Sequence, residues 1–226
     1  ELKQRYARPE LVNMKSSCNP ANTGDGHLMA MEIGARVLNS HMAAARIRFI
    51  APQRRKLVHM LPPWRVLTKF MELSLEYMPA WLLRPFIMSF LTTVLEAQPS
   101  LYRHGAILVN KRGERFCDEL DHPEFKLVEQ PDQHAYIVFD DRLAKKYSKF
   151  PHFVSTAPGV AYAYVPDYQR SRRDVFRKAP TIEALARKIG ADPLTLVQTI
   201  SKRNASLAPD MSEGGTAADT LSIEVG

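Results

Sequence analysis

A turn with two glycines around an acid lies near the start of the chain, at Thr23-Gly24-Asp25-Gly26. Glycines let the backbone approach a ligand closely, and a helix that begins at such a turn presents unpaired N–H groups. The Asp25 carboxylate can accept a hydrogen bond from a hydroxyl or a ring N–H. The same pattern is typical of a plain turn with a helix cap. These residues alone leave both interpretations open.

A second candidate for a functional site is the pair Arg115 and Glu119, in the stretch AILVNKRGERFCDE over residues 106–119. An apolar β run, a turn with Asn, Lys, Arg and Gly, and a returning segment predict a hairpin here. Arg115 and Glu119 are spaced to meet near its end. Such a pair is also common as a structural ion pair on a solvent-facing hairpin.

The composition is that of a folded domain. The 226 residues are 45% hydrophobic and 24% charged, which excludes a disordered, collagenous or disulfide-scaffold chain. The net charge of +7 is spread along the chain and interleaved with acids, so no nucleic-acid partner is predicted. Cys18 and Cys117 belong to no CxxC or Cys/His cluster. We therefore expect no metal site and a reducing, cytoplasmic setting.

The apolar stretch over residues 77–95 has about the length of a bilayer span. Pro79, Arg84 and Pro85 interrupt it, and a charge with two ring constraints in a lone span is costly. We expect buried or partly buried helices with no transmembrane span. Core packing is favoured there over a pocket lining or a membrane-surface contact.

Local patterns predict an α+β chain in which strands pair locally. The expected elements are a helix over 25–38, a strand over 45–50, helices across 64–95, strands over 106–109, 115–117 and 135–139, a helix over 142–147, a loop over 151–179, and a helical pair across 180–206. The polar, small-residue stretch from Pro209 is expected to be mobile.

Four motifs in order carry a resemblance: NTGDGHLMAMEIGA, then GAILVNKRGERFCDE, then AYIVFDD, then TIEALARKIGADPLTLVQTISKRN. This succession resembles the flavoprotein family of fumarate reductase and succinate dehydrogenase, which includes 3-ketosteroid dehydrogenases. The resemblance covers roughly residues 15–206. The hairpin and the helical pair are its more specific parts.

The resemblance implies a Rossmann-like FAD-binding domain interrupted by a cap domain that closes over the flavin and a small-molecule substrate. It assigns residues 1–50 to part of the FAD-binding domain, 51–206 to the cap or substrate domain, and 207–226 to a tail. It places the Thr23-Gly24-Asp25-Gly26 turn against FAD, and Arg115 and Glu119 on the substrate side.

Parts of the family's flavin site are missing from the sequence. The chain has no GxGxxG turn after an opening strand, which dinucleotide binding requires. The glycine-rich closing segment that completes the family's FAD site is also absent. The chain is therefore expected to be an internal fragment whose partners are the remaining FAD-domain segments, and to hold FAD poorly by itself.

Two departures argue against fumarate or succinate as the substrate. The family's Gln-x-His-Pro-Thr element corresponds to FIAPQ at residues 49–53, with no histidine before the proline. The family's proton-donating arginine after the hairpin corresponds to LDHPE at residues 120–124, where a lone loop histidine, His122, is more often simply exposed.

The cap segment predicts an apolar or keto substrate. It combines the apolar stretch 64–95 with a tyrosine cluster, Tyr162, Tyr164 and Tyr168, and ketosteroid dehydrogenases use tyrosines around an apolar ligand. Tyr162 and Tyr164 are the catalytic candidates, because a phenol can donate to a carbonyl and stabilise an enolate. Tyrosines that only pack in a loop are the alternative interpretation.

The resulting hypothesis is an FAD-dependent oxidoreductase that transfers a hydride between a substrate carbon and the flavin. Two rival hypotheses remain. One is a non-catalytic binding module whose basic surface and apolar segment bind a protein, lipid or nucleic acid. The other is a degenerate remnant of the cap domain that exposes apolar surface.

Overall fold

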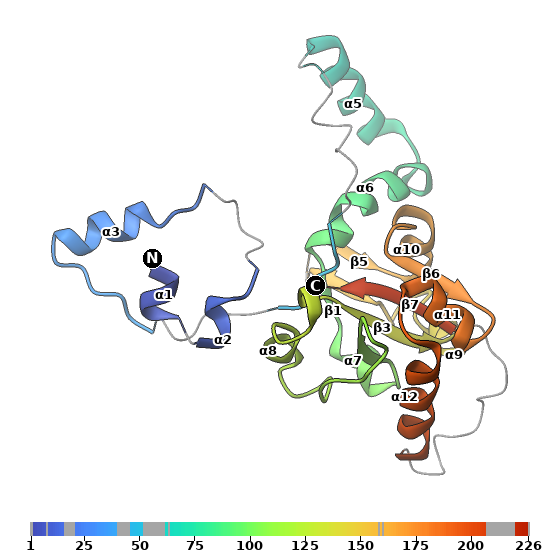
Figure 1. The fold of residues 1–226 in the computed structure, drawn as a ribbon. Coiled ribbons are helices and arrows are strands. Elements are labelled where there is room, and N and C mark those ends of the chain that lie inside the picture. The colour runs from blue at the N-terminus through green and yellow to red at the C-terminus, as the bar shows by residue number, and fades with distance from the viewer. Residues whose placement is uncertain are drawn as a thin grey trace.

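The computed structural model describes residues 2–7, 9–15, 21–39, 46–51, 62, 64–157, 159, 161–206 and 220–225. Figure 1 shows two antiparallel sheets with helices around them, and an N-terminal group of helices to one side. The prediction of a mixed helix and strand chain is therefore confirmed.

The helices and strands follow one another in mixed order. They are α1 (Leu2–Tyr6), α2 (Pro9–Val12), α3 (Asp25–Glu32), α5 (Arg65–Tyr77), α6 (Ala80–Val94), β1 (Glu96–Ala97), α7 (Pro99–Arg103), β2 (Ile107–Asn110), α8 (Pro123–Leu127), the 3₁₀ turn η2 (Pro131–Gln133), β3 (Ala135–Asp140), α9 (Asp141–Lys146), β4 (Ser155–Ala157), β5 (Ala161–Ala163), α10 (Val165–Ser171), β6 (Phe176–Ala179), α11 (Ile182–Ile189), α12 (Pro193–Ser206) and β7 (Thr220–Val225).

The larger sheet has the order β2-β3-β7-β6, and every neighbouring pair is antiparallel. Ile137 of β3 lies opposite Leu108 of β2 on one side and Ile223 of β7 on the other. The last strand of the chain is thus internal to the sheet. The prediction of a mobile tail is wrong for residues 220–225, and residues 207–219 lie outside the described part of the chain.

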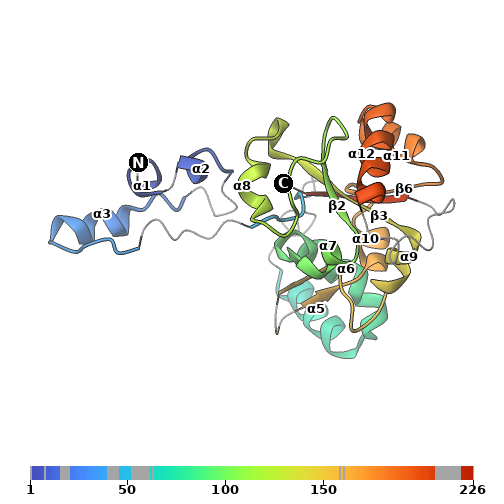
Figure 2. The same cartoon turned by 90° about the horizontal axis from the view of Figure 1, so that it is seen from below.

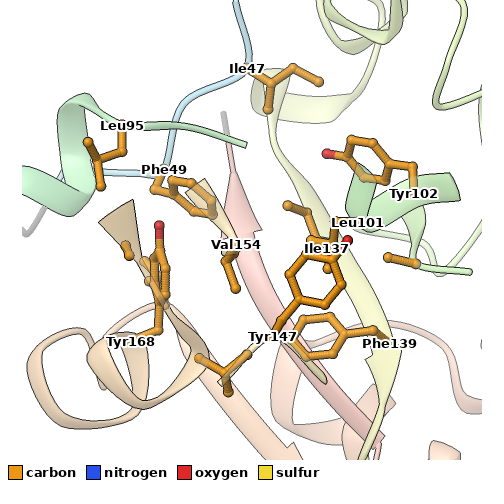
Figure 3. Close-up of a cluster of buried hydrophobic side chains, with 14 of the residues drawn as sticks. Ile47, Phe49, Leu95, Leu101, Tyr102, Ile137, Phe139, Tyr147, Val154 and Tyr168 are labelled. Carbon is orange, nitrogen blue, oxygen red and sulfur yellow. The ribbon is translucent and has the colours of Figure 1, made fainter. Parts of the chain in front are cut away.

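Both faces of this sheet are buried, because successive side chains of a strand point to opposite sides. Leu108 and Ile137 belong to one apolar cluster, which Figure 3 shows with Leu101 and Tyr147 beside Ile137. Their strand neighbours Ile107 and Val138 belong to a second cluster with helices α11 and α12. Strands buried on both faces read as continuous apolar runs, which explains why β2 and β3 were predictable.

The smaller sheet has the order β1-β4-β5 and lies against α6 and α10. The segment over 46–51 joins its edge through a bridge between Arg48 and Glu96. Phe49 of this segment lies 4.8 Å from Tyr168 of α10, measured between ring centroids, and both are buried (Figure 3). The strand predicted over 45–50 is therefore a short bridge, and residue 45 is not described.

Residues 151–179 were predicted as loop, and this was wrong. They contain β4, β5, α10 and β6. The strands here are three or four residues long, too short for an alternating pattern to show, and their order comes from pairing with β1 and β7.

The predicted helical pair is confirmed with its caps. The Thr181 hydroxyl accepts from the Ala184 N–H at 3.1 Å at the start of α11, and Gly190 ends it in the left-handed region at φ 77°. Asp192 then accepts from the Thr195 N–H at 2.7 Å at the start of α12. These are the side-chain and glycine caps that the sequence predicts.

Helices α1, α2 and α3 lie to one side of both sheets in Figures 1 and 2. The Lys15 N–H donates to Gln133 Oε1 at 3.0 Å, and Gln133 Nε2 donates to the Asn13 carbonyl at 2.7 Å, which joins this group to η2. Helix α3 ends at Glu32, earlier than predicted, and it has no buried residue.

Substitution of Gly113 by alanine is expected to lower the free energy of unfolding by about 1–3 kcal/mol. Gly113 has φ +87°, and an added Cβ would lie 3.2 Å from both Cβ and N of Leu196 in α12. Gly190→Ala is the matched control, because its φ of +77° is similar and no atom lies within 4 Å of an added Cβ. Urea denaturation should show a clearly larger loss for Gly113→Ala; equal losses would contradict the close approach of the hairpin to α12.

Candidate functional site

The turn before α3 has the geometry of a ligand contact that is open to solvent. Gly24 has φ 89°, in the left-handed region, and the Thr23 hydroxyl donates to Asp25 Oδ2 at 2.6 Å. Thr23, Asp25 and Gly26 are exposed, and nothing lies within 4 Å of a Cβ added at Gly26. The turn can therefore offer first-turn N–H groups and a carboxylate to a ligand.

Arg115 and Glu119 are brought together as the sequence predicts. Arg115 Nε donates to Glu119 Oε1 at 2.8 Å and Arg115 Nη2 donates to Oε2 at 2.6 Å, so the pair is bidentate. The Leu108 N–H of β2 also donates to Glu119 Oε1, at 3.0 Å. Glu119 is only 5% exposed, and its side chain is thereby fixed against the sheet.

Glu119 lines a cavity of about 230 Å³. Its wall is formed by Arg46, Ile47, Glu96, Ala97, Pro99, Tyr102, Glu119, Leu120, His122, Pro123 and Glu124. This volume is below the range of about 300–1,000 Å³ that is usual for drug-sized ligands. The cavity therefore fits a small molecule or one end of a larger one.

Tyr102 contributes an unusual group to this cavity wall. Its hydroxyl is buried and has no hydrogen-bond partner among the described residues. Burial, and then the negative charge of Glu119, raise the pKa of Tyr102, so that its hydroxyl stays protonated. A ligand with an acceptor atom in the cavity would satisfy this donor.

The groups beside Glu119 are not poised as nucleophiles. Burial is the main cause that raises the pKa of the Cys117 thiol to about 12, and Glu119 adds to it. The hydrogen bond to Glu119 raises the pKa of Arg115, which keeps the guanidinium charged. Cys117 is a free thiol that stays neutral at physiological pH, so thiolate chemistry is not expected there.

His122 lies in the cavity wall, although a loop histidine is ordinarily only exposed. Its Nδ1 is 3.0 Å from Glu124 Oε1, while most of its side chain faces solvent. His122 has φ 46°, and α8 begins directly after it. It therefore borders the cavity from outside rather than filling it.

Tyr162 lies in β5 and Tyr164 directly precedes α10, and Figure 1 shows these two elements on a different side of the fold from α8. Arg84 of α6 donates through Nη2 to the Tyr162 carbonyl at 2.9 Å, and its Cζ lies 5.5 Å from the Tyr164 ring centroid. Arg84 also forms a bidentate pair with Asp167, at 2.7 Å for both bonds. The backbone around both tyrosines is thus fixed by one buried carboxylate.

The two tyrosines differ from the third member of the predicted cluster. Tyr162 is 44% exposed, and its ring lies 4.9 Å from that of Phe153. Tyr168 is fully buried and its hydroxyl is 2.7 Å from Ser155 Oγ, with a pKa raised by burial. Tyr168 therefore belongs to the core, whereas Tyr162 is exposed and Tyr164 is half-buried.

The predicted site residues form three separate groups. The structure joins Arg115 to Glu119, and it holds Tyr162 and Tyr164 around Arg84. Helix α3, which carries the glycine turn, lies apart from β5 and α10 in both views (Figures 1 and 2).

Within the described ranges no cluster of His, Cys, Asp and Glu could hold a metal ion. No helix among the described residues is long and apolar enough to cross a bilayer.

Comparison with curated proteins finds fumarate reductases, although no family model matches. A probable fumarate reductase, Ifc3, from Shewanella frigidimarina (strain NCIMB 400) is 26% identical over 206 residues, which is 90% of this chain and 25% of the relative. A fumarate reductase (cytochrome) from Shewanella frigidimarina is 29% identical over 105 residues, or 45% of this chain and 15% of the relative. The chain thus spans about a quarter or less of the length of the curated relatives it matches.

Solved structures share the fold. The open conformation of a flavocytochrome c3 fumarate reductase matches with a TM-score of 0.60 and 24% identity, over 100% of this chain and 32% of that one. A 3-ketosteroid Δ1-dehydrogenase from Sterolibacterium denitrificans, solved with 1,4-androstadiene-3,17-dione, matches with a TM-score of 0.50 and 18% identity, over 99% of this chain and 38% of that one. The arrangement of helices and strands is therefore one found inside larger chains of both kinds.

Proposed function

We propose that this chain, whose homologues and structural neighbours are fumarate reductase flavoproteins and 3-ketosteroid dehydrogenases and which matches a part of them, is part of an FAD-dependent oxidoreductase. The observation that carries the proposal is the relationship to a fumarate reductase over 90% of the chain. The fold supports it, since all of this chain superimposes on a flavocytochrome fumarate reductase. In this proposal residues 51–206 cover the substrate, residues 1–50 contribute to the flavin domain, and segments outside this chain complete it.

The glycine turn before α3 fits one edge of a flavin. Its N–H groups are at an exposed helix start, and the Asp25 carboxylate is held by the Thr23 hydroxyl so that one acceptor atom is fixed. FAD, when bound, supplies the hydride exchange with a substrate carbon. Thr23, Gly24, Asp25 and Gly26 would hold it at this edge, and a phosphate cradle is expected from other segments, since the chain has no GxGxxG turn.

We propose an apolar or keto substrate for the complete enzyme. The departures from the fumarate pattern at residues 49–53 and 120–124 support this choice. The exposed Tyr162 and the half-buried Tyr164 support it further, because a neutral phenol can donate to a substrate carbonyl and so stabilise the charge that develops on oxygen. Arg115 and Glu119 serve in this proposal as the substrate-side wall formed by the hairpin.

The cofactor assignment is tested with the native protein that contains this sequence. A visible flavin spectrum that is bleached by a 3-ketosteroid or another apolar ketone-forming substrate, and not by succinate, is the expected result. A colourless protein would overturn the flavin assignment. Bleaching by succinate alone would overturn the proposed substrate class while leaving the oxidoreductase assignment in place.

In that flavin-containing protein, Tyr162→Phe or Tyr164→Phe is expected to lower kcat by about 10²–10⁴-fold with little change in KM, because the lost donor acts on the developing oxyanion. Tyr6→Phe in α1 is the matched control and should leave kcat unchanged. Steady-state kinetics with the bleaching substrate measures this effect. Full turnover in both cap variants would show that these tyrosines only pack.

A further inference from the structure

Tyr102 of α7 carries a hydroxyl that the described part of the chain does not use. The residue is 6% exposed, and its hydroxyl is buried with no hydrogen-bond partner among the described residues. A buried hydroxyl without a partner costs free energy, and most buried polar groups in proteins are bonded to protein or water. The Tyr102 hydroxyl is therefore a donor that is open to a further group.

Tyr147 shows how the same side chain looks when its hydroxyl is structural. It is fully buried, and its hydroxyl donates to Ser100 Oγ at 3.1 Å and lies 2.8 Å from His104 Nδ1. Tyr102 has nearly the same burial without such bonds. A phenylalanine would pack equally well in the place of Tyr102, so packing gives no reason for its hydroxyl.

The Tyr102 side chain reaches a cavity that Ile47 and Glu119 also line. Figure 3 shows the hydroxyl end of Tyr102 pointing away from α7, toward the side on which Ile47 lies. Burial raises the pKa of Tyr102, and the nearby charge of Glu119 raises it further. The wall of the cavity therefore holds a phenol that stays protonated and can donate.

The charged groups of the cavity wall favour a neutral ligand. Three carboxylates and one guanidinium line the cavity: Glu96, Glu119, Glu124 and Arg46. Arg46 Nη1 is already bound to Glu96 Oε2 at 2.9 Å, and His122 Nδ1 lies 3.0 Å from Glu124 Oε1. Among the described lining residues no cation is thus left to hold a carboxylate or a phosphate, and the surplus of acids repels an anion.

The remaining wall of the cavity favours a carbonyl on an apolar body. It consists of Ile47, Ala97, Pro99, Leu120 and Pro123. A carbonyl needs only a donor, whereas an alcohol also needs an acceptor, and both oxygens of Glu119 already accept hydrogen bonds. The volume of about 230 Å³ suits a single ring or the end of a larger molecule.

From these observations we propose that the cavity beside α8 binds the neutral keto end of a ligand, with the Tyr102 hydroxyl donating to its carbonyl oxygen. The inference deepens the proposed function, and it rests on that function in taking the ligand to be the substrate of the complete enzyme. It places this keto group at the wall that Glu119 forms, apart from the group that Tyr162 and Tyr164 would contact. Tyr102 is a binding residue here and transfers no proton.

The binding experiment uses two ligands that share one ring. Cyclohexanone carries the carbonyl acceptor, and methylenecyclohexane has a CH₂ group in place of the oxygen. Saturation-transfer NMR on the native protein that contains this sequence measures both dissociation constants. Saturable binding of cyclohexanone is the expected result, and its absence would overturn the proposal.

Two tyrosine variants test whether the hydroxyl is the donor. Tyr102→Phe is expected to raise the dissociation constant of cyclohexanone about 3–10-fold, from the loss of one neutral hydrogen bond, and to leave that of methylenecyclohexane unchanged. Its urea midpoint should equal or exceed that of the wild type, because the free protein loses no hydrogen bond. Tyr147→Phe is the matched control, which should lower the urea midpoint and change neither dissociation constant.

Three results would overturn the site. One is equal affinity of Tyr102→Phe and the wild type for cyclohexanone. Another is a urea midpoint of Tyr102→Phe that falls as far as that of Tyr147→Phe, since the hydroxyl would then already have a partner. The third is tighter binding of cyclohexanecarboxylate than of cyclohexanone, which would contradict the neutral ligand class.

The colour of the protein separates this inference from the proposed function. A colourless protein whose cyclohexanone binding depends on Tyr102 would retain the keto site and overturn only the flavin assignment. A flavin-containing protein that is bleached by an apolar ketone-forming substrate, but binds cyclohexanone independently of Tyr102, would retain the proposed function and overturn this site.

Discussion

Substitution of Asp174 by alanine is expected to lower the free energy of unfolding by about 2–3 kcal/mol. Arg172 is 1% exposed, and its guanidinium donates from Nε and Nη2 to Asp174 at 3.0 Å for both bonds. Removal of the carboxylate leaves a buried cation without its counter-charge. Because Asp174 is 43% exposed, water reaches that end of the pair, and the loss is smaller than for a fully buried pair. Urea denaturation at neutral pH measures it.

Two further variants separate charge burial from general loss of packing. Glu72→Ala removes a carboxylate from the exposed pair with Lys69 and is expected to change stability by less than about 0.5 kcal/mol. Arg172→Met in the Asp174→Ala background removes the stranded charge, so it should restore part of the loss. A double variant as unstable as the sum of its two single variants would contradict this explanation.

Arg172 also explains how the segment over 46–51 is held. Its Nη2 donates to the Ile50 carbonyl, and its Nη1 lies 3.3 Å from the Thr92 hydroxyl of α6. One guanidinium therefore ties this segment to α6 and to the turn after α10. Arg46 and Ile47, which line the cavity beside Glu119, are positioned by the same segment.

The parts of the fold that could be predicted from the sequence have local signals. The runs that form β2 and β3 are continuously apolar because both of their faces are buried, and α11 has a threonine cap and a terminal glycine. Strand β7 was missed because its partners are far away in sequence: Ile223 pairs with Ile137 of β3. The alternation of apolar and polar residues in β7 is short and follows a polar stretch, so the sequence pattern did not indicate a strand there.

The candidate site also contains contacts that have a local sequence signal and contacts that have none. Arg115 and Glu119 are four residues apart, so the hairpin pattern was enough to predict that they meet. The bonds from Arg84 to Asp167 join residues 83 positions apart, and no local period reports such a contact. Tyr102 was also missed, since a tyrosine in a short helix gives no sign that its hydroxyl is buried without a partner.

Substitution of Arg115 by methionine is expected to have the largest effect near the cavity, a loss of about 3–5 kcal/mol at neutral pH. The Glu119 side chain is 3% exposed, so it would remain as a buried carboxylate with the Leu108 N–H as its donor. Methionine keeps most of the apolar stem of arginine, so the loss reports the missing charge rather than a cavity. Urea denaturation of the two proteins gives the difference.

A second substitution tests whether the stranded charge is the cause. Glu119→Gln in the Arg115→Met background should recover much of the loss at neutral pH, because the amide keeps an acceptor for the Leu108 N–H without a charge. A loss that is not recovered by Glu119→Gln would mean that Arg115 stabilises the hairpin by packing, and that Glu119 does not depend on it as a counter-ion.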